Sequence, residues 1–348
     1  MIQRDTFGQA RDGRDVTRFT LAAGTIAAEI LTLGATLSAL RAPDRAGLCR
    51  DVTLGFAGLA PYLDVHPYLG STVGRVANRI GHARFTLDGR TYQLAANIGA
   101  HHLHGGPTGF HMRLWDVVDV DDGADPALRL RWVSQAGEEG YPGALTVDTV
   151  YQVTRESELR IEFYATCDAP TPVNLTNHAY FNLAGAGDIL DHELELHASQ
   201  FVPTDADCIP FGITRPVAGT PMDFRTATRV GARIAADDEQ LRIGHGYDHC
   251  WVFDKPAGEL ETVARLVHRE SGRVMELATT QPGVQLYTGN YLDGSLVGRD
   301  GTRYGRHAAL CLETQHLPDS VNHAGFPSTI LRPGMTYHQT TVHRFEVC

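Results

Sequence analysis

The chain has 348 residues, of which 43% are hydrophobic and 20% are charged, and this balance supplies a packed core and gives little reason to expect disorder. Thirty basic and 41 acidic residues give a formal charge of −11, and no block of Lys and Arg could follow a phosphate backbone, so we expect no nucleic-acid partner. Residues 1–15 mix charges of both signs and lack the apolar stretch of a secretory signal. No apolar run in the chain is long enough to span a bilayer. We therefore expect a soluble, cytoplasmic protein with no membrane partner.

In chain order, a period of two in hydrophobicity predicts strands at residues 25–33, 128–135, 144–153, 158–166, 192–201 and 262–270. The short turn clusters between them, rich in Gly, Asp and Pro, are typical of antiparallel hairpins. Only residues 225–234 read as a short helix. Because strands do not alternate with helices, we predict an all-β fold, one large antiparallel β-sandwich that forms a single domain over residues 1–348.

Common catalytic and redox signatures are missing. Residues 185–190 lack the third glycine of a dinucleotide-binding loop, and neither a P-loop nor a G-x-S-x-G motif occurs. Six cysteines occur without a C-x-x-C pair, which favours free thiols over a zinc knuckle or a disulfide framework. These observations exclude the common nucleotide-binding and nucleophile-elbow signatures and leave the chemistry open.

Two histidine-rich segments were considered as metal sites. In HELELH, a strand would point His192 and His197 to opposite faces, so they could not share a metal ion. In HHLHGG, His102 and His104 would share a face if extended and could supply two ligands, but clustered histidines more often serve as hydrogen-bonding groups. We expect no metal.

Glu313 and His178 are ionisable groups set in apolar sequence. Glu313 ends the nearly continuous apolar run of ALCLETQH, where loss of hydration would raise its pKa and make it a usable base near neutral pH. Taken alone, a structural ion pair with an Arg is the better explanation of this Glu, because such pairs also perturb carboxylates. His178 is bracketed by Asn177, Tyr180 and Phe181 in NLTNHAYFNLAG, and it is either a satisfied core histidine or a proton carrier whose ring these neighbours orient.

Asp248 lies in GYDHCW between Tyr247 and Trp251 at the start of an apolar strand. An aromatic ring beside a carboxylate suits a sugar site, because the ring covers apolar C–H groups while the acid accepts hydroxyl protons. A strand-end Asp that closes a turn is the plain alternative.

Seven motifs in one order resemble those of the aldose 1-epimerases, also called galactose mutarotases. The resemblance covers most of the chain, from about Gly70 to the C-terminus, and its motifs are GRVANRI, HHLHGG, NLTNHAYFNLAG, FVPTDADCIPFG, GYDHCW, PGVQLYTGN and CLETQ. It implies that family's large β-sandwich with few short helices. It also implies cofactor-free interconversion of the α and β anomers of hexoses such as glucose or galactose.

Carried over residue by residue, the resemblance makes Glu313 the catalytic base and His178 the catalytic acid. The side chains that it implies as sugar contacts are Asn78, Arg79, His104, Asp248 and Gln285, with Tyr180 as a further candidate beside the acid. Such a pair would remove a proton from the C1 hydroxyl and give one to the ring oxygen, which opens the ring without a covalent intermediate.

The chain departs from the family pattern at His101, where Asn is common, and at Cys250 and Trp251, where Asn and Phe are usual. These changes bear on which sugar fits rather than on the proton carriers.

Three alternatives stay open at this stage. A non-catalytic carbohydrate-binding protein would need no proton pair, and a metal-dependent isomerase would use the histidines. An epimerase of hexose 6-phosphates would need a cationic pocket, to which Arg75, Arg79 and Arg84 are the candidate contributors.

Overall fold

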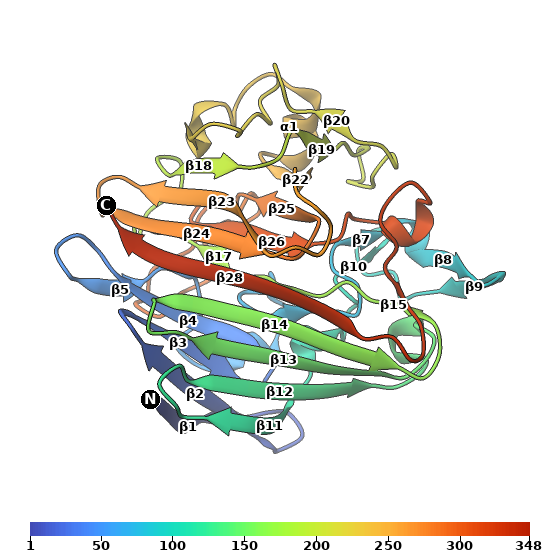
Figure 1. The fold of residues 1–348 in the computed structure, drawn as a ribbon, viewed down its shortest axis with the longest axis horizontal. Helices are drawn as coiled ribbons and strands as arrows, with labels where there is room; N and C mark the ends of the chain where they lie inside the picture. Colours follow the sequence, from blue (N-terminus) through green and yellow to red (C-terminus); the bar gives the residue numbers. More distant parts are fainter.

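Three large sheets hold most of the strand residues of the computed structural model, which describes residues 1–348. Every pair of neighbouring strands within them is antiparallel. The nine-stranded sheet has the order β11 (Asp116–Asp121), β12 (Ala127–Ser134), β13 (Leu145–Val153), β14 (Glu158–Cys167), β28 (Tyr337–Val347), β24 (Arg273–Thr279), β23 (Glu261–His268), β18 (Glu193–Leu196) and β21 (Thr228–Arg229). Figure 1 shows it crossing the front of the molecule.

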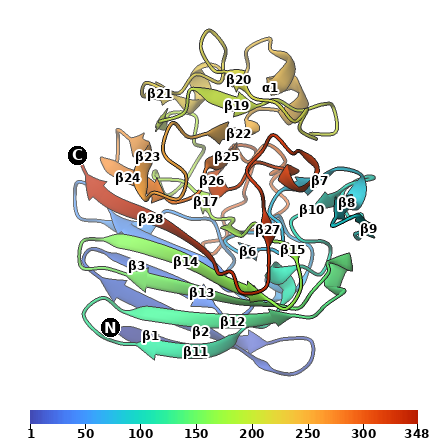
Figure 2. The ribbon, with the colours of Figure 1, turned by 45° about the vertical axis from the view of Figure 1, so that its right-hand side comes forward.

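The six-stranded sheet lies behind the upper part of the nine-stranded sheet in Figure 1, and its central strands appear to the right of β23 and β24 in the turned view of Figure 2. Its order is β17 (Tyr180–Phe181), β26 (Leu310–Gln315), β25 (Gly283–Tyr287), β22 (Asp248–Val252), β19 (Gln200–Val202) and β20 (Arg215–Pro216). The five-stranded sheet has the order β1 (Ile2–Gln9), β2 (Asp15–Ala23), β3 (Ile26–Leu31), β4 (Thr36–Pro43) and β5 (Cys49–Asp51).

Four two-stranded ribbons complete the β-structure. They pair β7 (Arg79–Ile80) with β10 (His102–Leu103), β8 (Arg84–Leu87) with β9 (Arg90–Gln93), β6 (Thr72–Val73) with β16 (Thr176–Asn177), and β15 (Thr171–Pro172) with β27 (Ile330–Leu331). The one α-helix, α1 (Glu239–Gly244), begins where the Asp238 carboxylate accepts hydrogen bonds from two backbone N–H groups. No helix is long and apolar enough to cross a membrane.

One apolar core joins the three large sheets. It contains Ile30 of the five-stranded sheet, Leu130 and Ile161 of the nine-stranded sheet, and Leu286 and Leu312 of the six-stranded sheet. These side chains are buried because alternate positions of β12 and β14 point inward while their neighbours face solvent. The prediction of an antiparallel all-β fold is confirmed. The interpretation of residues 1–348 as a single domain stays a prediction.

Two predicted elements are wrong. Residues 192–201 form two strands instead of one: β18 joins the nine-stranded sheet and β19 joins the six-stranded sheet. The predicted helix at 225–234 contains β21 and a 3₁₀ turn at Val230–Ala232. Gly231 and the β-branched residues of this segment favour a helix weakly, and the Val230 N–H bonds to the His192 carbonyl instead.

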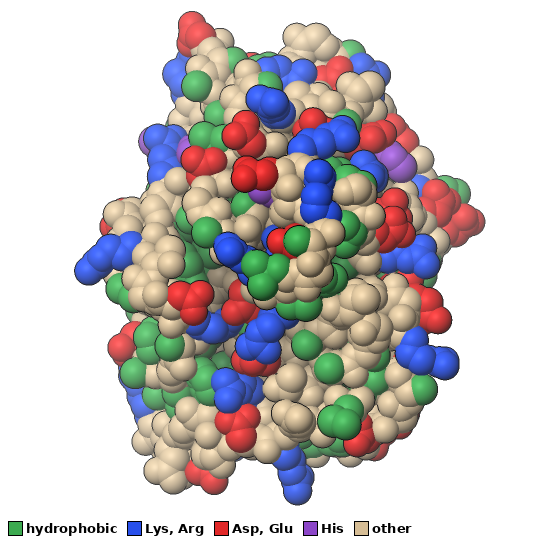
Figure 3. Space-filling model, turned by 90° about the vertical axis from the view of Figure 1, so that its left-hand side faces the viewer, with side chains coloured by type: hydrophobic (Ala, Val, Ile, Leu, Met, Phe, Trp, Pro, Cys, Tyr) green, Lys and Arg blue, Asp and Glu red, His purple; other side chains and the backbone are tan.

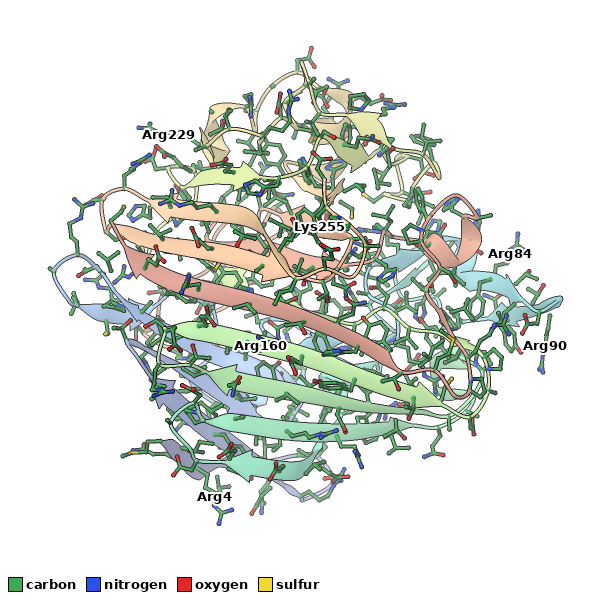
Figure 4. All side chains as sticks on the ribbon, viewed as in Figure 1. Arg4, Arg84, Arg90, Arg160, Arg229 and Lys255 are labelled. Atoms are coloured by element: carbon green, nitrogen blue, oxygen red, sulfur yellow. The ribbon has the colours of Figure 1, made fainter.

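The surface carries charges of both signs. On the face that Figure 3 shows, basic and acidic side chains are interspersed. The six basic side chains labelled in Figure 4 lie on separate segments around the molecule.

Candidate active site

The six-stranded sheet places four of the predicted site residues on one face, including Tyr180 of β17, which lies opposite Cys311 of β26. Cys250 of β22 lies opposite Gln285 of β25, and Gln285 lies opposite Glu313 of β26. Asp248 is two residues before Cys250, so its side chain points to the same face. Every residue of β25 and β26 is buried, and the polar side chains on this face are therefore shielded from bulk water.

Asn78, Arg79 and His104 meet through the ribbon of β7 and β10, in which Arg79 pairs with Leu103. Asn78 has a φ of 62°, a left-handed conformation that Asn tolerates better than most residues. Its carbonyl accepts the His104 N–H at 3.0 Å, and its own N–H donates to His104 Nδ1 at 3.2 Å. Burial holds the pKa of His104 well below its usual value. The neutral ring therefore carries its proton on Nε2 and presents a hydrogen-bond donor.

The ring of His178 stacks with two tyrosines. Tyr180 stacks on one side with ring centroids 5.0 Å apart, and Tyr68 is also close to parallel with it at 5.7 Å. The backbone is fixed as well, because the His178 N–H donates to the Ser71 carbonyl and the His178 carbonyl accepts from the Gly70 N–H, both at 2.9 Å. Stacking and backbone anchoring leave the imidazole one orientation.

Glu313 and His178 face each other, with Oε1 and Nε2 3.5 Å apart. Both are almost completely buried, with exposed fractions of 2% and 4%. Burial raises the pKa of Glu313 well above its usual value, and the charge of Asp248 raises it further while Arg79 opposes the shift. Burial also lowers the pKa of His178 to about 3. Both shifts favour a pair that holds one proton and no net charge.

Asp248, Gln285 and Arg79 form a polar cluster next to this pair. The Gln285 amide donates to Asp248 Oδ1 at 2.7 Å, and Arg79 Nη2 lies 3.8 Å from Asp248 Oδ2. A small cavity touches these three residues and Asn78. Three buried atoms, Arg79 Nε, Gln285 Oε1 and Glu313 Oε2, have no hydrogen-bond partner in the protein. A buried polar atom without a partner is costly, and a ligand with both donors and acceptors would pair these three atoms.

All eight predicted residues thus belong to one region, linked by the contacts above. Sequence reasoning missed two neighbours of His178. Tyr68 has a half-buried ring and carries no motif signal, and Cys311 places its Sγ 3.5 Å from His178 Nδ1. Cys311 could have been found from the strand period, since it is two residues before Glu313 and shares its face.

The other residues of the histidine-rich motifs have structural roles. His102 is buried between the Ala95 carbonyl and the Tyr141 hydroxyl, each 2.7 Å from a ring nitrogen. It does not share a face with His104, because His104 has a φ of 50° and the segment is not extended there. His192 is buried and His197 is exposed, so these two do not act together.

Comparison with known proteins identifies the family. The family model described as aldose 1-epimerase matches residues 17–344. Galactose mutarotase from Mus musculus is 44% identical over 99% of both chains, and aldose 1-epimerase from Escherichia coli K12 is 36% identical over 98% of both. The chain belongs to the aldose 1-epimerase family. It is therefore an isomerase, and the family and enzyme class predicted from the seven motifs are confirmed.

A solved structure of an aldose 1-epimerase homologue from C. elegans has the same fold. Its TM-score is 0.88 at 34% identity, over 95% of this chain and 99% of that one. The mutarotase-like β-sandwich implied by the resemblance is confirmed by this match.

His104, His178 and Glu313 each place one possible metal-ligand atom within 4.8 Å of the other two. The hydrogen bond from the Asn78 N–H occupies Nδ1 of His104 and leaves a proton on Nε2. A metal ion would need that nitrogen's lone pair. The donor set therefore suits sugar hydroxyl groups better than a cation.

Proposed function

We propose that Glu313 is the base and His178 the acid in the interconversion of α and β anomers of a neutral hexose such as glucose or galactose. The observation that carries this assignment is the buried contact of 3.5 Å between Glu313 Oε1 and His178 Nε2. Ring opening needs a general base and a general acid close together, and this buried pair provides both.

In each direction of the reaction, the sugar loses one proton to the enzyme and gains one proton from it. Glu313 accepts the proton of the C1 hydroxyl while His178 donates a proton to the ring oxygen, and the C1–O5 bond breaks to give the open aldehyde. Rotation about C1–C2 presents the other face of the carbonyl. Ring closure returns both protons, so the enzyme is restored without a cofactor.

The reaction needs a charged pair, with a carboxylate on Glu313 and a proton on His178. Burial favours the form in which both groups are neutral, so the charged form needs additional stabilisation. Hydroxyl groups of a bound sugar would donate to the Glu313 carboxylate and take the place of the water that burial removed. The proton of the pair can then reside on His178, from which it reaches the ring oxygen.

The six proposed sugar contacts supply both donors and acceptors. His104 would donate from Nε2, Arg79 from its unpaired Nε, and Gln285 would accept at Oε1. Asp248, fixed by Gln285, would accept hydroxyl protons. The other contacts in the proposal are Asn78 and Tyr180.

The hexose 6-phosphate alternative is disfavoured by the positions of the arginines. Arg75 is buried, and its guanidinium donates only to protein oxygens, among them the Pro142, Gly143 and Gln135 carbonyls. Arg84 is exposed on β8 at the outer edge of the molecule (Figure 4). Only Arg79 remains, and Asp248 balances its charge, so no cationic phosphate pocket forms from these three residues.

A polarimetric assay with fresh α-D-glucose, α-D-galactose, xylose and arabinose tests the activity and its specificity. We expect rapid mutarotation of at least one aldohexose, unchanged by EDTA. Glucose 6-phosphate should compete at least about tenfold more weakly than glucose. Strong competition by the phosphate would refute a neutral-hexose site, and loss of activity with EDTA would refute metal-free chemistry. The cytoplasmic location also stays a prediction.

A further inference from the structure

A second polar cavity lies outside the candidate active site. Its volume is about 330 Å³, at the lower end of the range of small-molecule sites, and it contains none of the eight proposed site residues. Three chain segments line it: residues 51–54 after β5, residues 182–188 after β17, and residues 299–308 before β26.

Side-chain bonds to the backbone fix the walls of this cavity. The Asn182 amide donates to the Ala308 carbonyl at 2.8 Å and the Gly187 carbonyl at 3.2 Å, which ties the second segment to the third. The Tyr304 hydroxyl donates to the Gly55 carbonyl at 2.7 Å, which ties the third segment to the first. The cavity is therefore built by the fold rather than left between loose loops.

Polar atoms without a partner occur here, as in the active site. Thr53 is 6% exposed, and its Oγ1 has no hydrogen-bond partner in the protein. Asp51 Oδ1 and Arg299 Nη2 also lack a hydrogen-bond partner, although Asp51 Oδ2 accepts from Arg299 Nη1 at 2.8 Å and Arg41 Nε lies 3.7 Å from Asp51 Oδ1. An Asp–Arg pair beside an unpaired hydroxyl resembles the pair of Asp248 and Arg79.

The charges that line the cavity cancel. Three aspartates and three arginines contribute, namely Asp51, Asp188, Asp300, Arg299, Arg303 and Arg306. An anion would need an excess of arginine and a metal cation an excess of carboxylate. Balanced donors and acceptors, together with the apolar side chains of Val52 and Leu54, suit a neutral molecule with several hydroxyl groups.

We propose that this cavity is a second binding site for a neutral polyhydroxylated molecule of monosaccharide size. The ligand is either an aldose, the class of the enzyme's own substrate, or a polyol without an anomeric carbon. Aldoses and polyols present similar hydroxyl groups. They differ in that an aldose can also occupy the active site.

Methyl NMR on the full chain tests this proposal, because Leu54 and Ala308 line the cavity while Val202 lines the active-site cavity. Galactose and sorbitol are titrated separately. We expect the Leu54 and Ala308 signals to follow a binding curve with a Kd different from that of Val202. If sorbitol shifts only the cavity signals, the site takes polyols; if galactose alone shifts them, it takes aldoses.

The matched variant is Thr53→Val, which removes the unpaired hydroxyl and keeps the shape. It should weaken binding at Leu54 and Ala308 by about threefold to tenfold and leave the Val202 curve and the mutarotation rate unchanged. A second variant, Ala186→Phe, should abolish the cavity shifts by filling the space. Absence of shifts with both compounds, or cavity signals that follow the Val202 curve in wild type and in Thr53→Val, would overturn the proposal.

Discussion

The nine-stranded and six-stranded sheets bury their residues in different ways. In β14 of the larger sheet, buried and partly exposed residues alternate, and the buried ones are apolar. In β26 of the smaller sheet every residue is buried, including Glu313, Thr314 and Gln315. An apolar buried face contributes stability, whereas a polar buried face is costly to desolvate and is kept for a function. The difference between these two strands fits the proposal that the six-stranded sheet carries the candidate site, although the larger sheet also buries some polar side chains, such as Asp148 and Arg273.

The largest effect on stability is expected in the larger sheet. Leu130 of β12 is completely buried in the shared core, so Leu130→Ala should lower the free energy of unfolding by about 2 to 5 kcal/mol. The rate per folded molecule should not change, because Leu130 is a core residue and is not one of the candidate-site residues. Urea unfolding and polarimetry on the same sample measure the two quantities. If folded Leu130→Ala protein lost most of its mutarotation rate, the nine-stranded sheet would not differ from the six-stranded sheet in its effect on catalysis.

The largest effect on rate is expected in the smaller sheet. Glu313→Gln and His178→Asn each remove one proton carrier and should each lower mutarotation by at least ~10²-fold. Both replacements are close in size, so the unfolding curve should shift little compared with that of Leu130→Ala. Near-normal rates in either folded variant would refute the assignment of that residue.

A smaller effect is expected at Tyr68, which stacks on His178 in addition to Tyr180. Loss of one aromatic contact is worth about 0.5 to 1.5 kcal/mol, so Tyr68→Ala should lower kcat by about twofold to tenfold. Tyr68→Phe keeps the ring and is the control. Equal losses in the two variants would show that the hydroxyl, rather than stacking, matters.

The smallest effect is expected from a change of pH. Burial lowers the pKa of His178 to about 3 and raises that of Glu313, so the pair should hold a single proton over a widened pH range. We predict that kcat/KM stays within about twofold as pH falls from about 7 to about 5, the region where an ordinary histidine gains its proton. A fall in kcat/KM centred near the usual pKa of histidine would contradict this environment for the pair.

Much of the fold follows from local pattern. β12, β13, β14 and β23 were predicted because alternating hydrophobicity records which face of a strand is buried. The same pattern could not show that residues 192–201 change sheets after β18, because both halves alternate and the break depends on tertiary pairing. The helix predicted at 225–234 failed for a similar reason, since β21 forms only by pairing with β18.

The candidate site was predicted from ordered motifs rather than from any one residue. The contact between His178 and Glu313 joins positions far apart in sequence, and no local pattern contains that information. The sequence predicts that the ring of His178 is oriented by Asn177, Tyr180 and Phe181. The structure supports this for the first two and not for Phe181. Tyr180 stacks on the ring and Asn177 anchors the nearby backbone at Gly70, whereas Phe181 packs on His343 in the core.

The central claim is that Glu313 and His178 act as one unit that shares a proton, and a double variant tests it most directly. Groups that act as a unit show non-additive losses, because removal of either one already disables the step. The mutarotation rate of Glu313→Gln combined with His178→Asn should therefore lie within about threefold of the slower single variant. A double variant that loses the product of the two single effects, about 10⁴-fold or more, would show that the two residues act independently.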